Sequence, residues 1–159
     1  MAHDDASLAI RPAAEADVSA VIGLVTEVLG EFGLEFGKGA ATDEQLRSLP
    51  ASYTSGGGAF WVAVRGEEVL GTCGVFPVGS AVYELRKMYL LPASRGLGLG
   101  RRLLEVAVAW VRARGGTHLV LDTVEQMASA ISFYEAHGFV RDDAQIRGAR
   151  CTRGYVRTL

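Results

Sequence analysis

The stretch that decides the fold is Leu91-Pro92-Ala93-Ser94-Arg95-Gly96-Leu97-Gly98-Leu99-Gly100-Arg101-Arg102. It begins where a strand-like run ends, passes through three glycines and opens an amphipathic helix. Glycines let the backbone approach a ligand closely, and the start of a helix offers unpaired N–H groups and the positive end of the dipole. The arginines of the stretch add cationic donors. The segment therefore predicts a phosphate-binding cradle between a strand and a helix.

Two familiar phosphate motifs fit this cradle poorly. It lacks the Lys-Ser/Thr pair of a nucleotide triphosphatase loop. A dinucleotide fingerprint would need a third glycine where Arg101 stands, although Asp122 lies at about the right distance for its ribose-binding acid. That fingerprint normally follows the first strand of its domain, whereas about half of this chain precedes the cradle. Dinucleotide binding and a glycine turn without a ligand remain the alternatives.

Strand-like and helix-like runs flank the cradle on both sides. Upstream, the pattern predicts strands over residues 8–11, 59–64, 69–76 and 82–91, and helices over residues 17–29 and 42–49. Downstream, it predicts helices over residues 99–115 and 128–137, and strands over residues 118–123, 139–141 and 151–159. Thr42 and Gln45 fit a capping box for the second helix, and the glycines of residues 30–41 predict a loop. The order predicts one mixed α/β domain over residues 1–159.

Composition argues against several classes of function. The 159 residues are 49% hydrophobic and 21% charged, which is typical of a folded domain. A net charge of −2 disfavours nucleic-acid binding, and no apolar run approaches the roughly 18 residues of a membrane span. Cys73 and Cys151 are too few for a disulfide framework and too isolated for a zinc site. We therefore expect no metal. Residues 1–7 lack the pattern of a signal peptide, so we also expect a cytoplasmic protein.

Charge is unevenly distributed along the chain. The first 50 residues hold nine acidic and three basic side chains, whereas residues 86–114 hold seven basic side chains and one acidic one. An acidic half and a basic centre are able to serve two ligands of opposite charge. A solvated surface of uneven composition explains the same counts, and both interpretations stay open.

Three motifs in the same order and spacing resemble one known family. Arg95-x-x-Gly98-x-Gly100 is similar to the R/Q-x-x-G-x-G/A signature of the GNAT superfamily of acetyl-CoA-dependent N-acetyltransferases. The run from Ala130 through Tyr134 to Gly138-Phe139 resembles the second motif of that family, A-x-x-x-Y-x-x-x-G-F. Residues 84–92 resemble its fourth strand, and Gly71-Thr72 resembles the end of its hairpin. The resemblance covers residues 71–139.

The resemblance implies a fold and a cosubstrate. The fold is a mixed, mostly antiparallel sheet of about six or seven strands with about four helices, splayed between the fourth and fifth strands. The cosubstrate is acetyl-CoA, with no metal. Its pyrophosphate would be held by backbone N–H groups of the glycine loop, and its pantetheine arm would pair with the backbone of the fourth strand. The implied cofactor-binding residues are Met88, Tyr89, Leu90, Arg95, Gly96, Leu97, Gly98, Leu99, Gly100 and Arg101.

The strand before the cradle carries an irregularity of its own. Leu85 and Met88 are three residues apart, yet both are apolar and predicted to face the core. A strand of period two forbids this unless a β-bulge intervenes. We therefore predict a bulge here, which would free backbone amides for the pantetheine and the thioester oxygen.

The resemblance also implies an acid and a base. Tyr134 is the candidate general acid for the departing thiolate, and a core aromatic is its alternative role. Glu84 is the candidate general base, acting through water, and surface pairing with Arg86 or Lys87 is its alternative. The family often has an asparagine where Met127 stands, so Gln126 or Ser129 takes over that contact or the contact is absent.

The acceptor side is predicted from charge alone. Glu31 and Glu35 lie in the glycine-rich loop that forms one wall of the acceptor pocket in the family, and Tyr83 is expected to shape that pocket. Together with Glu84 they predict a cationic primary amine of a small molecule or peptide, which attacks acetyl-CoA directly in a ternary complex. Glutamates that merely solvate a loop are the alternative. A non-catalytic acyl-CoA-binding module and a dinucleotide-binding protein are the competing functions, and a homodimer is left open.

Overall fold

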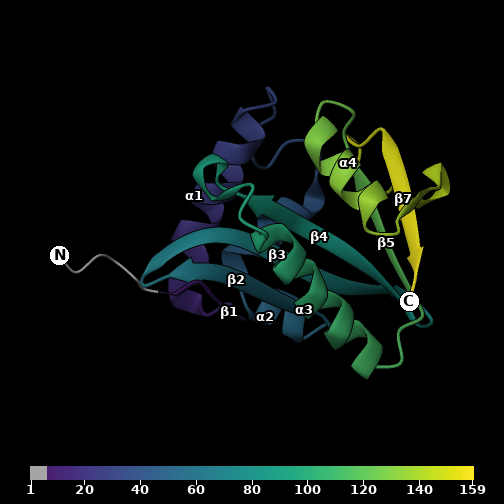
Figure 1. Ribbon diagram of the computed structural model, residues 1–159, viewed down its shortest axis with the longest axis horizontal. Coiled ribbons are helices and arrows are strands. Elements are labelled where there is room, and N and C mark those ends of the chain that lie inside the picture. Colours follow the sequence, from purple (N-terminus) through teal and green to yellow (C-terminus); the bar gives the residue numbers. More distant parts are fainter. Residues whose placement is uncertain (1–6) are drawn as a thin grey trace.

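One seven-stranded sheet organises the molecule. The structure is a computed structural model that describes residues 7–159; the residues in which we predicted no signal peptide fall mostly outside that range. The strands have the spatial order β1-β2-β3-β4-β5-β7-β6 (Figure 1). Their bounds are β1 (Ala9–Pro12), β2 (Ala59–Arg65), β3 (Glu68–Gly79), β4 (Val82–Leu90), β5 (His118–Thr123), β6 (Val140–Arg141) and β7 (Arg153–Thr158).

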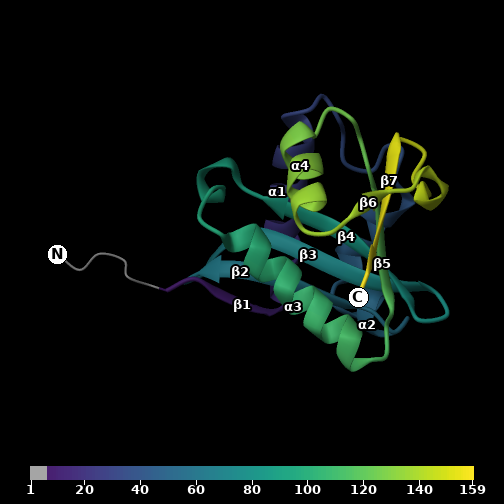
Figure 2. The same ribbon diagram turned by 45° about the vertical axis from the view of Figure 1, so that its right-hand side comes forward.

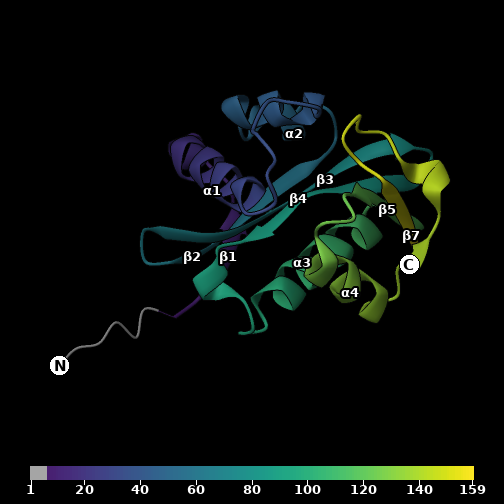
Figure 3. The same ribbon diagram turned by 90° about the horizontal axis from the view of Figure 1, so that it is seen from above.

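Helices cover both faces of the sheet. The helices are α1 (Val18–Gly30), α2 (Ala51–Thr54), α3 (Leu99–Ala113) and α4 (Ala128–Ala136), with short 3₁₀ segments η1 (Glu15–Asp17), η2 (Ala41–Ser48), η3 (Pro92–Ser94) and η4 (Asp143–Gln145). Seen from above, α1 and α2 lie on one face and α3 and α4 on the other (Figure 3). Figure 2 shows α3 crossing the front of the strands beneath α4. None of the helices within residues 7–159 combines the length and apolar character that crossing a bilayer requires.

Two hydrophobic cores follow from the strand period. On β2, Trp61 and Ala63 belong to the core beneath α3 and α4, whereas Phe60 and Val62 belong to the core beneath α1. Successive side chains of a strand point to opposite faces, so one run of apolar residues fills both layers. The predicted order of strands and helices around the cradle is confirmed.

The predicted β-bulge is present in β4. In the antiparallel pairing with β3, Thr72 is opposite Tyr89 and Gly74 is opposite Arg86. Two residues of β4, Lys87 and Met88, therefore lie opposite the single residue Cys73. Leu85 and Met88 both contact the core beneath α3, as the sequence predicted.

The sheet opens between β4 and β5. These parallel strands pair only over Val82–Glu84 and His118–Val120 and then diverge. Beyond Glu84, β4 keeps β3 as its partner on one side, but β5 no longer pairs with its other edge. The splay implied by the family resemblance is confirmed, and it places open backbone beside the cradle.

Two local predictions upstream were wrong. The segment that starts at Ala41 is a 3₁₀ helix, and no side-chain hydrogen bond caps it, so Thr42 and Gln45 form no capping box. The side chain that organises this segment is Asp43, which is fully buried and accepts a hydrogen bond from the N–H of Gly37. The chain then adds the short helix α2, which the sequence reading did not predict.

Candidate active site

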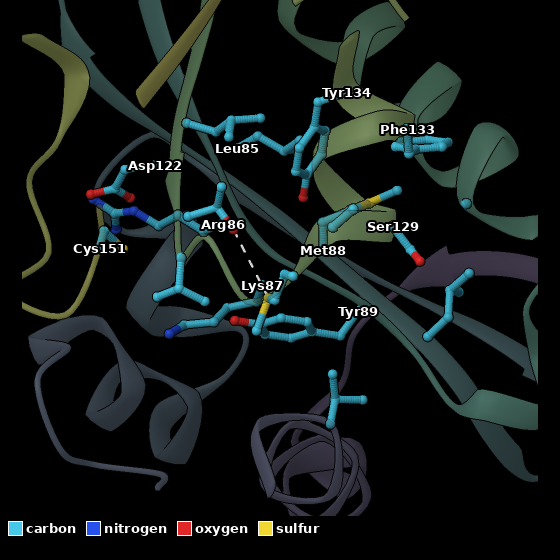
Figure 4. Close-up of a pocket in the computed structure, with 18 of the residues that line it drawn as sticks. Leu85, Arg86, Lys87, Met88, Tyr89, Asp122, Ser129, Phe133, Tyr134 and Cys151 are labelled. Atoms are coloured by element: carbon cyan, nitrogen blue, oxygen red, sulfur yellow. Dashed lines mark hydrogen bonds between the residues drawn. The ribbon is translucent and has the colours of Figure 1, made fainter. Parts of the chain in front are cut away.

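A cleft of about 770 Å³ lies where β4 and β5 separate. One end, called here the glycine end, is formed by residues 95–101 with Ser129 and Phe133 of α4. The other, the charged end, is formed by Glu84, Arg86 and Lys87 of β4, Asp122 of β5, and Arg147 and Arg150 of the loop before β7. Figure 4 shows Asp122 and Cys151 on one side, Ser129 and Phe133 on the other, and Tyr134 between them. The cleft thus joins the predicted cradle to a cluster of charges.

The glycine end offers backbone donors with little side-chain cover. Gly96 and Gly98 have φ values of +80° and +79°, a region that favours glycine. A Cβ atom at either position would meet nothing within 4 Å, so the loop leaves open space. Gly98 is the N-cap of α3, and the first helical bond runs from the N–H of Arg102 to its carbonyl. The N–H groups of residues 99–101 therefore lack helical acceptors, as an anion site needs.

The arginines of the cradle are engaged by the protein itself. Nη1 and Nη2 of Arg95 each donate to Glu31 at 2.8 Å, and Nε and Nη2 donate to the carbonyl of Leu90 at 3.1 and 2.9 Å. Arg101 pairs with Glu105 one turn along α3. Arg95 thus fastens the loop to β4 and α1, and backbone groups supply the free donors of the cradle.

Two side-chain contacts hold the bulge in place. The hydroxyl of Thr72, which is fully buried, donates to the carbonyl of Lys87 at 2.7 Å. Lys87 has a φ of +54°, a left-handed conformation that costs a non-glycine residue roughly 1–2 kcal/mol. Its ammonium forms a buried ion pair with Asp43 of η2. This pair offsets the strain and ties η2 to the bulge.

Asp43 is the centre of a buried charge network. Besides Lys87, its carboxylate accepts from Arg150 at 3.1 Å and from the N–H of Gly37 at 2.8 Å. Burial alone would raise the pKa of Asp43, but these partners outweigh burial and hold that pKa below its ordinary value. Burial lowers the pKa of Lys87, and Asp43 offsets only part of that effect. The network joins η2, β4 and the loop before β7.

Tyr134 packs into the core with its ring and also lines the cleft. Its ring packs edge-on against Phe133 and Phe139, with centroids 5.7 and 5.6 Å away. Its hydroxyl points into the cleft toward the bulge of β4 (Figure 4). Burial raises the pKa of this phenol well above its ordinary value. The raised pKa keeps the hydroxyl protonated at neutral pH, which is the form that a proton donor must have.

Glu84 is buried at the charged end, with only 4% of its surface exposed. Oε1 accepts from Nε of Arg86 at 2.5 Å, so the pairing predicted at the surface is in fact a buried one. Oε2 is buried and has no hydrogen-bond partner within the described part of the chain. Nη1 of Arg147 lies 3.6 Å from Oε2. One oxygen of Glu84 therefore lacks a hydrogen-bond donor from the described residues, in a side chain that lines the cleft.

The structure does not bring the three predicted acceptor-side residues into the cleft. Tyr83 packs edge-on against Trp110, with ring centroids 5.8 Å apart. Glu35 pairs with Lys38 in an exposed bridge, and Glu31 is turned to Arg95. None of them lines the cleft, because each has a partner elsewhere. The loop lines the cleft through Phe32, Leu34, Ala40 and Ala41 but not through its glutamates, so an acidic acceptor wall stays a prediction.

The remaining predicted residues lie near the glycine end. Met88, Tyr89 and Leu90 line the cleft, and burial raises the pKa of the Tyr89 phenol to about 12. Leu97 is the exposed tip of the loop and does not line the cleft. Met127, at the position of the usual asparagine, is buried, and Ser129 rather than Gln126 reaches the cleft.

Four charged residues of this site escaped the sequence reading. Asp43, Arg147 and Arg150 were not singled out, and Lys87 entered only as a surface partner for Glu84. The contact between Arg150 and Asp43 spans 107 residues, and no local motif encodes such a distance. Only Lys87 gave a weak signal of this network, because a lysine at the predicted bulge needs an acidic partner.

The splayed sheet with a backbone cradle beside it is the arrangement of an acyltransferase. A family profile described as "Acetyltransferase (GNAT) family" matches residues 27–139, and the chain belongs to this family. It is 36% identical over 131 residues to the uncharacterized N-acetyltransferase YjgM of Escherichia coli, covering 80% of this chain and 78% of that protein. It is 35% identical over 101 residues to the probable N-acetyltransferase family 8 member 5 of mouse, covering 60% of this chain and 44% of that longer protein.

Solved structures show the same fold. An acetyltransferase of the GNAT family from Staphylococcus aureus has a TM-score of 0.88 at 22% identity, with 96% of this chain and 99% of that chain covered. The PaiA N-acetyltransferase of Thermoplasma acidophilum, solved in complex with coenzyme A, has a TM-score of 0.78 at 19% identity over 96% and 99% of the two chains. The predicted family and fold are confirmed.

Proposed function

We propose that this protein transfers the acetyl group of acetyl-CoA to a primary amine of a small molecule or peptide, by direct attack in a ternary complex. The observation that carries the proposal is the placement of a protonated tyrosine and an unpartnered carboxylate oxygen in one cleft that also contains the backbone cradle. Direct transfer needs an acid and a base near one reacting centre, and we assign these roles to Tyr134 and Glu84.

The residues at the glycine end fit the long anionic cosubstrate. Backbone N–H groups of residues 96–101 would hold its pyrophosphate, and the edge of β4 at residues 88–90 would hold its pantetheine arm. The support is the open space above Gly96 and Gly98 and the lack of a strand partner on that edge of β4. When bound, acetyl-CoA supplies a thioester carbonyl to an amine.

The chain's own groups account for the protons. Glu84 accepts a proton from the ammonium form of the acceptor, directly or through water, and leaves a neutral amine. As the new C–N bond forms and the C–S bond breaks, Tyr134 donates its phenolic proton to the departing sulfur. The acetylated nitrogen then returns its surplus proton to the tyrosinate. Glu84 then releases its proton to solvent, so that both residues return to their starting forms and one proton is released for each turnover.

The dinucleotide alternative finds no support at Asp122. Its Oδ2 accepts from the N–H groups of Arg147 and Gly148 at 2.6 and 2.7 Å, so the carboxylate that would bind a ribose holds a loop instead. Residues 7–159 contain no group of three or more His, Cys, Asp or Glu side chains placed to hold a metal ion.

The proposal is tested with Tyr134→Phe. This change keeps the ring packing and removes the proton, so the maximal rate of coenzyme A thiol release with an amine panel should fall about a hundredfold or more. Acetyl-CoA affinity by calorimetry and the melting temperature should stay near the wild-type values. Tyr83→Phe is the matched control, because that hydroxyl is outside the cleft. A Tyr134→Phe rate within about threefold of wild type would exclude Tyr134 as the acid.

A further inference from the structure

The charged end of the cleft carries more positive than negative side chains. The cations that line it are Arg86, Lys87, Arg147 and Arg150, and the anions are Glu84 and Asp122. Oε1 of Glu84 is paired with Arg86, and Oδ2 of Asp122 accepts from two backbone N–H groups. Because the lining cations outnumber the anions, this end disfavours a polycation.

Arg147 is the cation with spare donors. Its position is fixed by its own backbone N–H, which donates to Asp122 at 2.6 Å. Among residues 7–159 its guanidinium donates only through Nη1, to the carbonyl and the side chain of Gln145 at 3.1 and 3.3 Å. Its Nε and Nη2 atoms remain for another acceptor, and its side chain is 39% exposed at the cleft.

Arg147 and Glu84 form a pair of opposite charges that is close without being bonded. Nη1 of Arg147 lies 3.6 Å from Oε2 of Glu84, beyond hydrogen-bond length, and that oxygen is buried without a partner. An unpaired buried carboxylate oxygen is costly, so a donor in the cleft would be bound favourably there. The Nε and Nη2 atoms of Arg147, which have no acceptor among the described residues, favour the binding of an anion beside it.

We infer that the acceptor is a free α-amino acid or a close derivative that keeps its α-carboxylate. Its ammonium donates a hydrogen bond to Oε2 of Glu84, and its carboxylate accepts hydrogen bonds from Arg147. The inference rests on the proposed function and names the substrate class of the same site. It replaces the cationic acceptor expected from Glu31 and Glu35.

The charge balance favours this class over its analogues. A zwitterion brings one positive and one negative group on the same carbon, so each half of the Glu84–Arg147 pair gains a partner and no net charge enters the cleft. An amide or a decarboxylated amine leaves the guanidinium without its anion and adds an uncompensated positive charge. Planar, bidentate recognition of a carboxylate is also the contact for which arginine is suited.

The experiment measures binding to the coenzyme A-loaded protein by calorimetry. The probes are the twenty standard amino acids and, for leucine, phenylalanine and serine, the carboxamide and the amine that lacks the carboxylate. We expect at least one amino acid to bind about tenfold or more tightly than its amide and its amine. Arg147→Gln should remove that preference, and Arg147→Lys should retain part of it. Arg141→Gln, an exposed arginine paired with Asp143 outside the cleft, should leave the preference intact.

Two results would overturn the inference. One is that no amino acid binds, or that amides or polyamines bind as tightly as the acids. The other is that Arg147→Gln keeps the preference for the acids. Thiol release on the same panel separates the two proposals: turnover that favours amides removes the inference and keeps the acetyltransferase function. Arg147-dependent amino-acid binding without any turnover keeps the inference and removes the function.

Discussion

The glycine end and the charged end of the cleft are built in opposite ways. The glycine end comes from one continuous stretch of chain, and its free donors are backbone N–H groups. The charged end is assembled from side chains of η2, β4, β5 and the loop before β7, held by buried ion pairs. A backbone site tolerates many side chains but no bulk, whereas a side-chain site depends on each member. Substitutions at the two ends should therefore fail differently.

The largest effect on ligand binding is expected at the glycine end with Gly98→Glu. The new carboxylate would enter the open space beside the unbonded N–H groups and compete with an anionic ligand. We expect acetyl-CoA affinity, measured by calorimetry, to fall by at least about a hundredfold, equivalent to about 2.7 kcal/mol. Gly98→Ala is the control, since it introduces the backbone strain of a φ of +79° without the charge. If both variants bind alike, strain and not an occupied cradle explains the loss.

At the charged end, Asp43→Asn should damage the fold itself. The change leaves Lys87 and Arg150 buried with their charges uncompensated. Breaking a buried pair in this way typically costs about 3–5 kcal/mol of unfolding free energy, which denaturant melts would measure. Asp143→Asn is the control, because it removes an aspartate from an exposed pair with Arg141. Equal stability of the two variants would contradict a structural role for the network.

The same carboxyl should make stability depend on acid. Because the pKa of folded Asp43 is below its ordinary value of about 3.9, its contribution is present above that pH and is lost as pH falls below it. Wild-type protein should therefore lose more stability between pH 5 and 3 than Asp43→Asn does. Melting temperatures of the two proteins over this range are the measurement, and parallel curves would contradict the assignment.

The two ends also differ in how far they could be predicted from the sequence. The glycine loop and the bulge were predictable because each depends on a local pattern or on the period of one strand, whereas the splay was implied by the family resemblance. The pairing of Asp43 with Lys87 and Arg150 was not, because the partners are 44 and 107 residues away. The contact of Glu31 was missed for the same reason, because its partner Arg95 is 64 residues away in the sequence.

A smaller loss of stability is expected for Thr72→Val, at the bulge of β4. Valine keeps the shape of threonine but removes the hydroxyl that donates to the bulge carbonyl of Lys87. Leaving that buried carbonyl without its donor should cost about 1–3 kcal/mol of stability and lower turnover through a displaced bulge. Thr117→Val removes an exposed hydroxyl and should change stability by less than about 0.5 kcal/mol. A neutral Thr72→Val would mean that the Lys87–Asp43 pair alone holds the bulge.

The smallest effect is expected for Glu31→Gln, and it decides to which end this glutamate belongs. Its pair with Arg95 is partly exposed, so its loss should cost less than about 1 kcal/mol of stability. In this variant Arg95 keeps its hydrogen bond to the carbonyl of Leu90. The positive charge of its guanidinium is then no longer neutralised by Glu31 and is free to attract the anionic cosubstrate. Acetyl-CoA affinity should therefore be unchanged or rise by a few-fold, while the Michaelis constant of the acceptor stays constant because Glu31 does not line the cleft. A raised acceptor constant with unaltered acetyl-CoA affinity would return Glu31 to the acceptor wall and reinstate a cationic substrate. Steady-state kinetics with each substrate varied in turn distinguishes the two results.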